Sequence, residues 1–451
     1  MPPLNVLYLH SHDTGRCVQP HGHAVATPNL QALAERGVLF RQAFCAGPTC
    51  SPSRAALFTG KPPHAVGMYG LAHLGWSLDP DAQTIPRLLA GVGYDAVLGG
   101  FQHLTDWGPD DWRELGYTAA SPARNRSAEE RTAAACDFLR GPHERPFFLD
   151  LGFIETHRRG KAELHGEPIQ WHNGRSEPVG DPRYVLPPPP LPDTPETRTD
   201  WADFLVSAQR LDRCYGEVLA ALDEAGLRER TIVLVTTDHG VAFPRMKCNL
   251  TDHGTGVLML LTGPESLGLT GGRVVDAMVT HTDVLPSLCG WLGLPEPDGL
   301  TGRPLAPLLG GSLDPAEPDA LHDAVFTQVS HHVTREVERA IRTPRFKYIL
   351  RCQDEPIPFH STDASVSKEA MRAAGWGDTP LAAERLHDLL LDPQEACNLA
   401  EDPAHAETVA ALRGRLEAWM REHGDPALRH AVPDPAGRGG AARGDAGGAL
   451  A

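Results

Sequence analysis

The chain contains the run Thr231-Ile232-Val233-Leu234-Val235-Thr236-Thr237, and the polar pair Asp238-His239 follows it directly. Because the run is apolar almost throughout instead of alternating, it predicts a strand buried on both faces of a sheet. Comparable strands are predicted at 5–9, 94–98, 146–154 and 256–261. Helix patterns are predicted between them at 28–36, 128–140 and 200–225. We therefore expect an α/β fold with a mostly parallel central sheet between helix layers.

Polar side chains follow two of these strands at the point where each strand ends. His12-Asp13 come soon after the strand at 5–9, and Asp238-His239 come directly after the strand at 231–237. Ligands in open parallel sheets bind beyond the carboxyl ends of the strands, so both pairs are candidates for one functional site. Taken alone, an acid beside a histidine after a strand is more typical of a capped turn.

The composition changes along the chain and predicts three parts. We expect a main domain over residues 1–315, which would carry both of these polar pairs, and a smaller α+β domain over residues 316–430, with a strand at 342–350 and a helix at 406–422. Residues 431–451 are rich in Gly, Ala, Arg and Asp, which is typical of a disordered tail. The polar, Pro-rich segment at 159–199 is expected to be a surface insertion.

The charge balance limits the classes of partner. The 451 residues include 41 Lys and Arg against 58 Asp and Glu, for a formal charge of −17. This balance argues against a nucleic-acid or anionic-membrane partner. No stretch approaches the roughly 20 apolar residues of a membrane helix, and no signal-peptide pattern is visible at the N-terminus. The nine cysteines are odd in number and form no CxxC pair, so we expect reduced thiols and a cytoplasmic location.

The most specific motif is Cys50-Ser51-Pro52-Ser53-Arg54, which continues to Thr59-Gly60. Pro52 fits the first turn of a helix, which would place Cys50 at the positive helix end, where an anionic group is favoured. The pattern C-x-P-S-R resembles the signature of the sulfatase family, in the alkaline phosphatase superfamily. Further segments extend the resemblance over about residues 4–425, among them 27–30, 236–240 and 386–403. The segment 67–71 resembles the sulfoglucosamine sulfohydrolase branch in particular.

The resemblance implies a hydrolase that acts on sulfuric ester bonds. In this family the cysteine is oxidised after translation to formylglycine (3-oxoalanine), whose hydrated aldehyde is the nucleophile. Cys50 is the matching residue here. The conversion implies a formylglycine-generating maturation enzyme as a partner.

The resemblance also implies one divalent metal ion, with Asp13, Asp238, His239 and the modified Cys50 as ligands. His12 stands where the family often has an acid, so it is the weaker candidate of the set. The family precedent favours calcium. The ring nitrogen of His239 leaves manganese or another transition metal open, because such metals accept nitrogen ligands more readily.

Four more residues match catalytic positions of the family. Arg54 would hold the nucleophile and neutralise charge, and Lys247 matches a later cationic position. His103 would handle the proton of the nucleophile, and His157 would lie on the side of the leaving group. Relatives tend to have a lysine before the histidine in a Gly-Lys-x-His pattern. We expect Gly100 to take the place of that lysine, so one cationic contact is missing or comes from elsewhere.

Three functions are compatible with these residues. The first is a sulfatase that hydrolyses a sulfate ester or sulfamate of a sugar or small molecule. The second is a phosphonate monoester or phosphodiester hydrolase of the same fold. The third is a non-catalytic protein that binds an anion, which the intact Cys50, Arg54, Asp13 and Asp238 oppose.

Overall fold

The computed structural model describes residues 3–106, 108, 110–159, 171–172 and 180–435. Its centre is an eight-stranded sheet with the order β5-β4-β6-β1-β7-β8-β2-β9. All neighbouring pairs are parallel except those made by β8, which is antiparallel to both β7 and β2. The strands are β1 Asn5–Ser11, β2 Val38–Phe40, β4 Asp95–Leu98, β5 Ala119–Ala120, β6 Phe147–Gly152, β7 Thr231–Thr237, β8 Met259–Thr262 and β9 Arg273–Val275.

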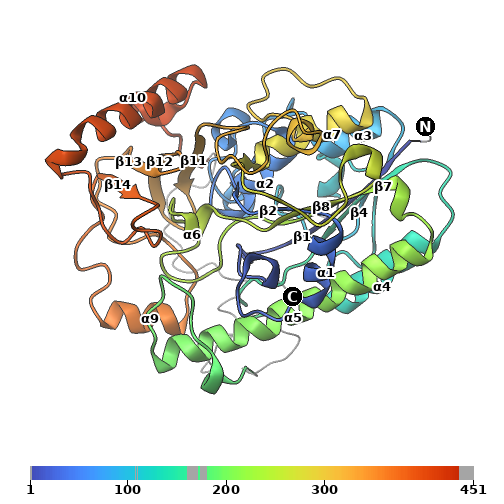
Figure 1. Cartoon of the computed structure of the whole chain (residues 1–451), viewed down its shortest axis with the longest axis horizontal. Coiled ribbons are helices and arrows are strands. Elements are labelled where there is room, and N and C mark those ends of the chain that lie inside the picture. Colours follow the sequence, from blue (N-terminus) through green and yellow to red (C-terminus); the bar gives the residue numbers. More distant parts are fainter. Residues whose placement is uncertain (1–2, 107, 109, 160–170, 173–179, 436–451) are drawn as a thin grey trace.

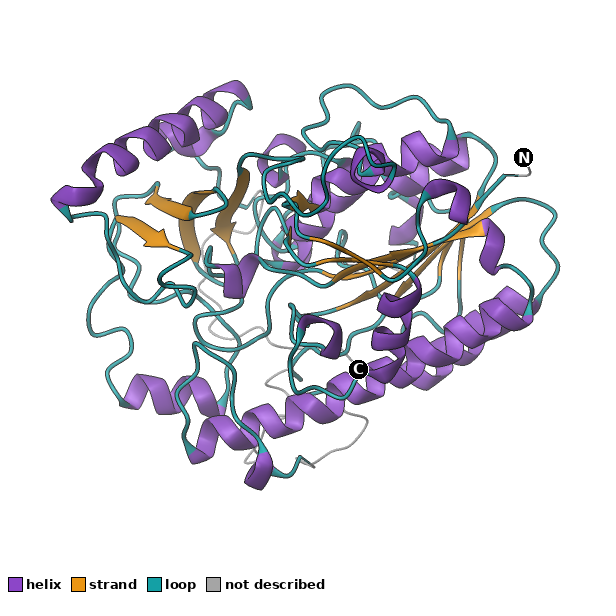
Figure 2. Ribbon diagram, viewed as in Figure 1, coloured by secondary structure: helices purple, strands orange, loops and turns teal. Residues whose placement is uncertain are grey.

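Helices cover both faces of this sheet, as Figures 1 and 2 show. One layer contains α1 Pro28–Arg36, α4 Ala128–Arg140 and α5 Pro195–Glu224. The other contains α2 Cys50–Thr59, α3 Ile85–Gly91 and α7 Val284–Leu292. Short helices at α6 Asp252–Thr255 and α8 Ala306–Leu309 and a two-stranded sheet of β3 Ala43–Phe44 and β10 Val279–Thr280 complete this part.

The alternation of side chains along the central strands explains why both faces are apolar. Val6 and Tyr8 of β1 enter one core cluster, whereas Leu7 and Leu9 enter the other. All seven residues of β7 are buried. The expected α/β class with a mostly parallel sheet is therefore confirmed.

A second, antiparallel sheet follows in the order β11-β12-β13-β14. Its strands are β11 Val325–His331, β12 Arg335–Arg342, β13 Phe346–Arg351 and β14 Glu384–Asp388. In the chain, helix α9 Val366–Ala373 comes after β13 and before β14. Helix α10 Ala406–Glu422 packs on the sheet through Val409, Leu412 and Leu416. The division at residue 315 stays a prediction, and most of the expected tail, 436–451, lies outside the described residues.

Three local expectations need correction. The strand expected at 342–350 is two strands, because Pro344 lies between them and the amide of Thr343 donates to the carbonyl of Phe346 in a turn. Helix α5 begins at Pro195 instead of residue 200, because Thr194 caps it. The segment 159–199 is not wholly at the surface, since Trp171 is fully buried against Arg158. Residues 160–170 and 173–179 of that segment lie outside the described part.

Among the described residues, no helix combines the length and the apolar character needed to cross a lipid bilayer.

Candidate active site

The register of β1 and β7 brings two loops together. The strands are parallel neighbours, with Ser11 opposite Thr237, so His12-Asp13 and Asp238-His239 leave the sheet side by side. The amide of Asp13 donates to Oδ1 of Asp238 over 2.9 Å. Asp13 has a positive φ of 54°, a conformation that Asp tolerates better than most residues. The expected meeting of the two acidic loops is therefore present.

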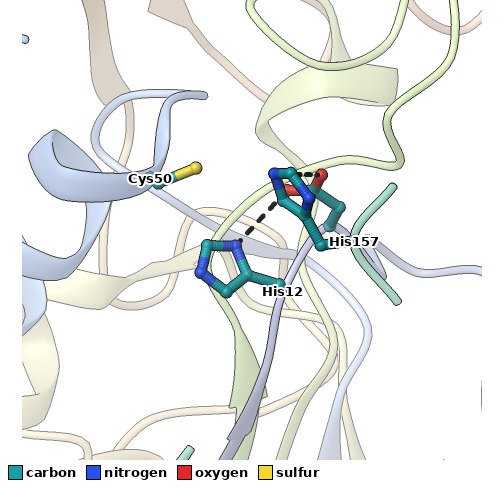
Figure 3. A group of neighbouring side chains, drawn as sticks. His12, Cys50 and His157 are labelled. Atoms are coloured by element: carbon teal, nitrogen blue, oxygen red, sulfur yellow. Dashed lines mark ion pairs between the residues drawn. The ribbon is translucent and has the colours of Figure 1, made fainter. Parts of the chain in front are cut away.

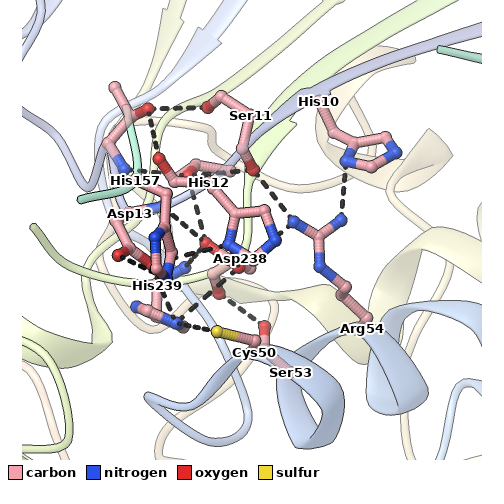
Figure 4. A network of polar contacts seen from close by, with 12 residues as sticks. His10, Ser11, His12, Asp13, Cys50, Ser53, Arg54, His157, Asp238 and His239 are labelled. Atoms are coloured by element: carbon pink, nitrogen blue, oxygen red, sulfur yellow. Dashed lines mark hydrogen bonds and ion pairs between the residues drawn. The ribbon is translucent and has the colours of Figure 1, made fainter. Parts of the chain in front are cut away.

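Helix α2 carries Cys50 and Arg54 into the same space. Cys50 is the first residue of α2, and Arg54 lies one turn later on the same face. The hydroxyl of Ser53 donates to the carbonyl of Asp238 over 2.5 Å, which ties the helix to the second loop. Nη2 of Arg54 donates to Oδ2 of Asp238 over 3.1 Å. Figure 4 shows these contacts around Cys50.

The loop after β6 closes another side of the site. The amide of Thr156 donates to the carbonyl of His12, and the amide of His12 donates to the carbonyl of Glu155. His157 follows, with Nε2 3.7 Å from Oδ2 of Asp13 and 3.4 Å from Nζ of Lys247. Figure 3 shows His12 and His157 on the same side of Cys50. The side chain of His157 is 20% exposed, so its ring lies at the open side of the site.

Four donor side chains fit a divalent metal ion. One ligand atom from each of Asp13, Cys50, Asp238 and His239 lies within 4.8 Å of the others, and all four residues are buried. Oδ1 of Asp13 is buried and accepts no hydrogen bond from the described residues. A buried acceptor without a partner, beside a second carboxylate and an imidazole, is characteristic of a site that binds a cation. The residues named from the sequence therefore converge and fit the ion.

His12 belongs to an overlapping donor set with Asp13, Cys50 and His157. Its Nδ1 lies 2.9 Å from Oδ2 of Asp238 and 3.7 Å from Oδ1 of Asp13. Burial alone would lower its pKa, but Asp238, Cys50 and Asp13 together outweigh burial and raise the pKa to about 10. Without an ion, His12 is thus a cationic partner of the two acids.

Positive charge surrounds the thiol of Cys50. Burial alone would raise the pKa of this thiol, but the charges of Lys247, His12 and His239 outweigh burial and lower the pKa to about 7. Its Sγ lies 3.4 Å from Nε2 of His239. The site is therefore built to hold negative charge at position 50.

Lys247 is the cation at the centre of this group. It is wholly buried, and its Nζ lies 2.9 Å from Oδ2 of Asp13. Burial would lower its pKa, but Asp13 and Asp363 outweigh burial and hold the pKa well above its usual value. The lysine therefore keeps its charge although it is buried.

His103 lies beside His73 and near His12. Its Nε2 is 2.8 Å from Nδ1 of His73, and its ring centroid is 6.0 Å from that of His12. Burial lowers the pKa of His103 well below the usual value, which favours a neutral ring. Its role toward the nucleophile stays a prediction.

The expectation for Gly100 needs a correction. A Cβ atom at residue 100 would lie only 2.1 Å from the carbonyl oxygen of Gly152, so no side chain fits there. The neighbouring side chain, Phe101, packs at the site instead, with its ring centroid 4.7 Å from that of His12. An apolar ring, and no lysine, therefore fills this corner of the described site, where Lys247 and Arg54 are the Lys and Arg side chains beside the acids.

Sequence reasoning missed several residues around the site. His10 of β1, which accepts from Arg54, is a buried histidine inside an apolar strand, and that pattern could have marked it. His73 contacts His103, and His281 contacts Ser53. Asp363 contacts Lys247 from the C-terminal part of the chain, and no local sequence pattern predicts this contact.

Comparison with known proteins agrees with this geometry. The family model described as Sulfatase matches residues 5–294. The N-sulphoglucosamine sulphohydrolase of Homo sapiens is 32% identical over 94% of this chain and 91% of its own length. The delta 4,5-hexuronate-2-O-sulfatase of Bacteroides thetaiotaomicron is 25% identical over 92% of this chain and 88% of its own length.

Solved structures share the fold at lower identity. The phosphonate monoester hydrolase of Agrobacterium radiobacter aligns with a TM-score of 0.68 at 21% identity, over 94% of this chain and 97% of that chain. This similarity supports the fold, and the match to the family model supports the family.

Proposed function

The chain belongs to the sulfatase family, whose members are hydrolases acting on sulfuric ester bonds, and from that premise we propose that it removes sulfate from a sugar. The bond would be a sulfate ester or a sulfamate. The observation that carries the proposal is Cys50 at the N-terminus of a buried helix, with ligand atoms of Asp13, Asp238 and His239 within 4.8 Å. A nucleophile position, an ion site and cations for sulfuryl oxygens thus occur together.

We propose that Cys50 is converted to formylglycine by a maturation enzyme, and that Asp13, Asp238, His239 and residue 50 hold one divalent ion. The formylglycine hydrate supplies an oxygen nucleophile, and the ion supplies positive charge that neutralises sulfuryl oxygens. Calcium is favoured by the family, whereas the nitrogen donor of His239 favours manganese. Elemental analysis of the purified protein decides between them.

The residues of this chain have separate tasks in the proposal. Arg54, held by Asp238, fixes the loop that carries the ion ligands and keeps positive charge beside residue 50. Lys247 offers an ammonium to the sulfate oxygens. His103 would accept the proton of the nucleophile.

His157 is placed to serve the leaving group. Its Nδ1 donates to the carbonyl of Arg158, which leaves Nε2 as an acceptor facing Lys247. Burial lowers the pKa of this ring, so it is neutral at rest. A sulfate anion bound beside it favours the protonated ring, which can then give the proton at Nε2 to the departing oxygen or nitrogen.

A sugar substrate is supported by the relatives. Two enzymes that align over nine-tenths of this chain are named for the glucosamine N-sulfate and the hexuronate 2-O-sulfate that they act on. A sulfated sugar, in O- or N-linked form, is therefore the substrate class to test first.

A hydrolysis panel tests the proposal. Wild type and Cys50→Ala are assayed with an aryl sulfate, a sugar O-sulfate, glucosamine N-sulfate, a phosphodiester and a phosphonate monoester. We expect turnover of the sulfates by wild type only, together with a mass loss in the peptide that covers Cys50. Cys136→Ala removes a buried cysteine of α4, away from this site, and is the matched control.

The histidine in the donor set favours one second candidate. Nε2 of His239 lies 3.4 Å from Oδ1 of Asp13, so the ion would have a nitrogen ligand. The fold that carries this site is also the fold of a phosphonate monoester hydrolase. Faster hydrolysis of the phosphonate or phosphodiester than of every sulfate would select this candidate. An unconverted thiol together with no turnover of any ester would contradict both enzyme functions.

A further inference from the structure

Asp363 brings a second carboxylate to Lys247 from the C-terminal part of the chain. Its Oδ2 lies 2.9 Å from Nζ of Lys247, the same distance as Oδ2 of Asp13. The lysine thus bridges one acid of the ion site and one acid that comes from the segment between β13 and α9. The family match ends at residue 294, so Asp363 lies outside it.

The two oxygens of Asp363 have different surroundings. Oδ2 is buried against Lys247, yet the side chain as a whole is 22% exposed. The exposed part therefore lies away from Lys247. No described residue donates a hydrogen bond to Oδ1, and this oxygen is not fully buried. Oδ1 is thus an accessible acceptor at the edge of the site.

An accessible carboxylate is unfavourable beside a site for an anion. A sulfate group that approaches Lys247 also approaches the negative charge of Asp363, which repels it. The ammonium of Lys247 is shared by two carboxylates, so Asp363 is not its sole counter-ion. The repulsion is offset when the substrate carries a hydrogen-bond donor that reaches Oδ1. A substrate without such a donor leaves the carboxylate unsatisfied, which is a basis for discrimination.

His332 adds a second polar group to the same corner. It comes from the end of β11, is 6% exposed, and its Nδ1 makes no hydrogen bond with any described residue. The charges of Lys247 and Asp363 both act on its pKa, which burial lowers to about 3. A neutral imidazole and a carboxylate, both from the part of the chain after β10, therefore interact electrostatically with Lys247.

We propose that Asp363 is a specificity-determining residue whose Oδ1 accepts a hydrogen bond from a hydroxyl or ammonium group of the sugar that carries the sulfate. The inference rests on the proposed function, and it also states which part of the substrate the C-terminal region recognises, namely the sugar that carries the sulfate. It predicts that sugars with a donor next to the sulfated atom are preferred over aryl sulfates, which have none.

Two variants test the proposal. Asp363→Ala removes charge and acceptor, and Asp363→Asn removes the charge but keeps an amide oxygen. For Asp363→Ala we expect kcat/KM with the sugar sulfate to fall about 10- to 100-fold more than kcat/KM with the aryl sulfate, whose loss reports the effect of the change on Lys247. If the donor is a hydroxyl, Asp363→Asn keeps most of the activity, and if it is an ammonium, both variants lose it. Asp354→Asn, at a 91% exposed carboxylate of the same segment, is the matched control.

Binding of the desulfated sugar gives a second readout that does not need turnover. Titration calorimetry should show weaker binding of the free sugar to Asp363→Ala than to wild type by a similar factor. Equal losses of kcat/KM on sugar and aryl sulfates, or unchanged sugar binding, would overturn the role of Asp363. Failure of wild type to hydrolyse any sulfate would instead overturn the proposed function, and the two failures are thus distinguishable.

Discussion

Nη1 of Arg54 donates to Nδ1 of His10 across 2.6 Å. A guanidinium has donors only, so Nδ1 of His10 must be the unprotonated ring atom. Nε2 then carries the proton and donates to Oδ1 of Asp150, 2.7 Å away. Oδ2 of the same carboxylate accepts from the hydroxyl of Tyr117. Burial lowers the pKa of His10, in agreement with a neutral ring. A buried chain of polar contacts thus runs from Asp150 through His10 and Arg54 to Asp238. Figure 4 shows His10, Arg54 and Asp238 of this chain.

We predict that His10→Ala lowers both stability and kcat. The change leaves the Asp150 carboxylate and one Arg54 donor without their partner, which should reduce the free energy of unfolding by about 2–4 kcal/mol. KM should change less than kcat, because Arg54 acts through the loop of Asp238. Denaturant unfolding and steady-state kinetics measure the two effects. His430→Ala, at an exposed histidine, is the control, and a variant as stable and active as wild type would contradict the tautomer assignment.

Asp238→Asn should lose the bound ion. The carboxylate is one of four donors within 4.8 Å, and its replacement by an amide removes a charge that the cation requires. We expect metal content by elemental analysis to fall from about one per chain toward zero, and chelation of wild type to lower its melting temperature. Asp276→Asn, at a surface acid paired with Arg41, should retain the ion. Full metal content in Asp238→Asn would refute the ligand assignment.

The effect of His157→Ala should depend on the leaving group. A poor leaving group needs the proton that His157 supplies, and general acid help of this kind is worth about 10²–10⁴-fold. We expect a large loss of kcat with sugar sulfates and a small loss with an activated aryl sulfate. A series of aryl sulfates with graded phenol acidity gives the slope directly. A uniform loss along the series would show that His157 does not protonate the leaving group.

The stability of the protein should fall as pH rises through the range of Glu395. This carboxyl is buried beside Asp252 and Lys347, and Arg342 contacts the same Asp252. Burial, with the charge of Asp252, raises the pKa of Glu395 to about 7, although Lys347 acts in the opposite direction. An acid whose pKa is raised by folding stabilises the native state below its usual pKa of 4.5, and that contribution is lost as pH rises toward 7.

Glu395→Gln stays neutral and should remove this loss. Relative to wild type, its free energy of unfolding should therefore be higher at pH 8 than at pH 5, by on the order of 1–3 kcal/mol. Urea unfolding at both pH values measures the difference, with Glu401→Gln, at an exposed carboxylate, as the control. A difference of the opposite sign would mean that Glu395 is charged in the native state.

Local pattern was sufficient for many elements of the fold. The apolar run at 231–237 is β7, and the helix expected at 406–422 is α10 with the same bounds. The expectation failed at Pro344, where a turn separates two strands, and at Trp171, which lies in a polar segment but packs in the core. The turn is local and is marked by Pro344 itself. The burial of Trp171 instead depends on distant residues such as Phe243, and periodicity does not report that.

The sequence by itself determined the family, the parallel sheet and the loops that carry Asp13, Cys50, Asp238 and His239. These are local properties, because apolar strands, a capped helix and polar residues after strands can each be predicted from residues that are consecutive in the sequence. Only the tertiary structure decided that no side chain fits at Gly100, that His10 holds Arg54, and that Asp363 reaches Lys247. Each of these depends on a contact between residues 44 or more positions apart in the chain, and the folded backbone alone sets such distances.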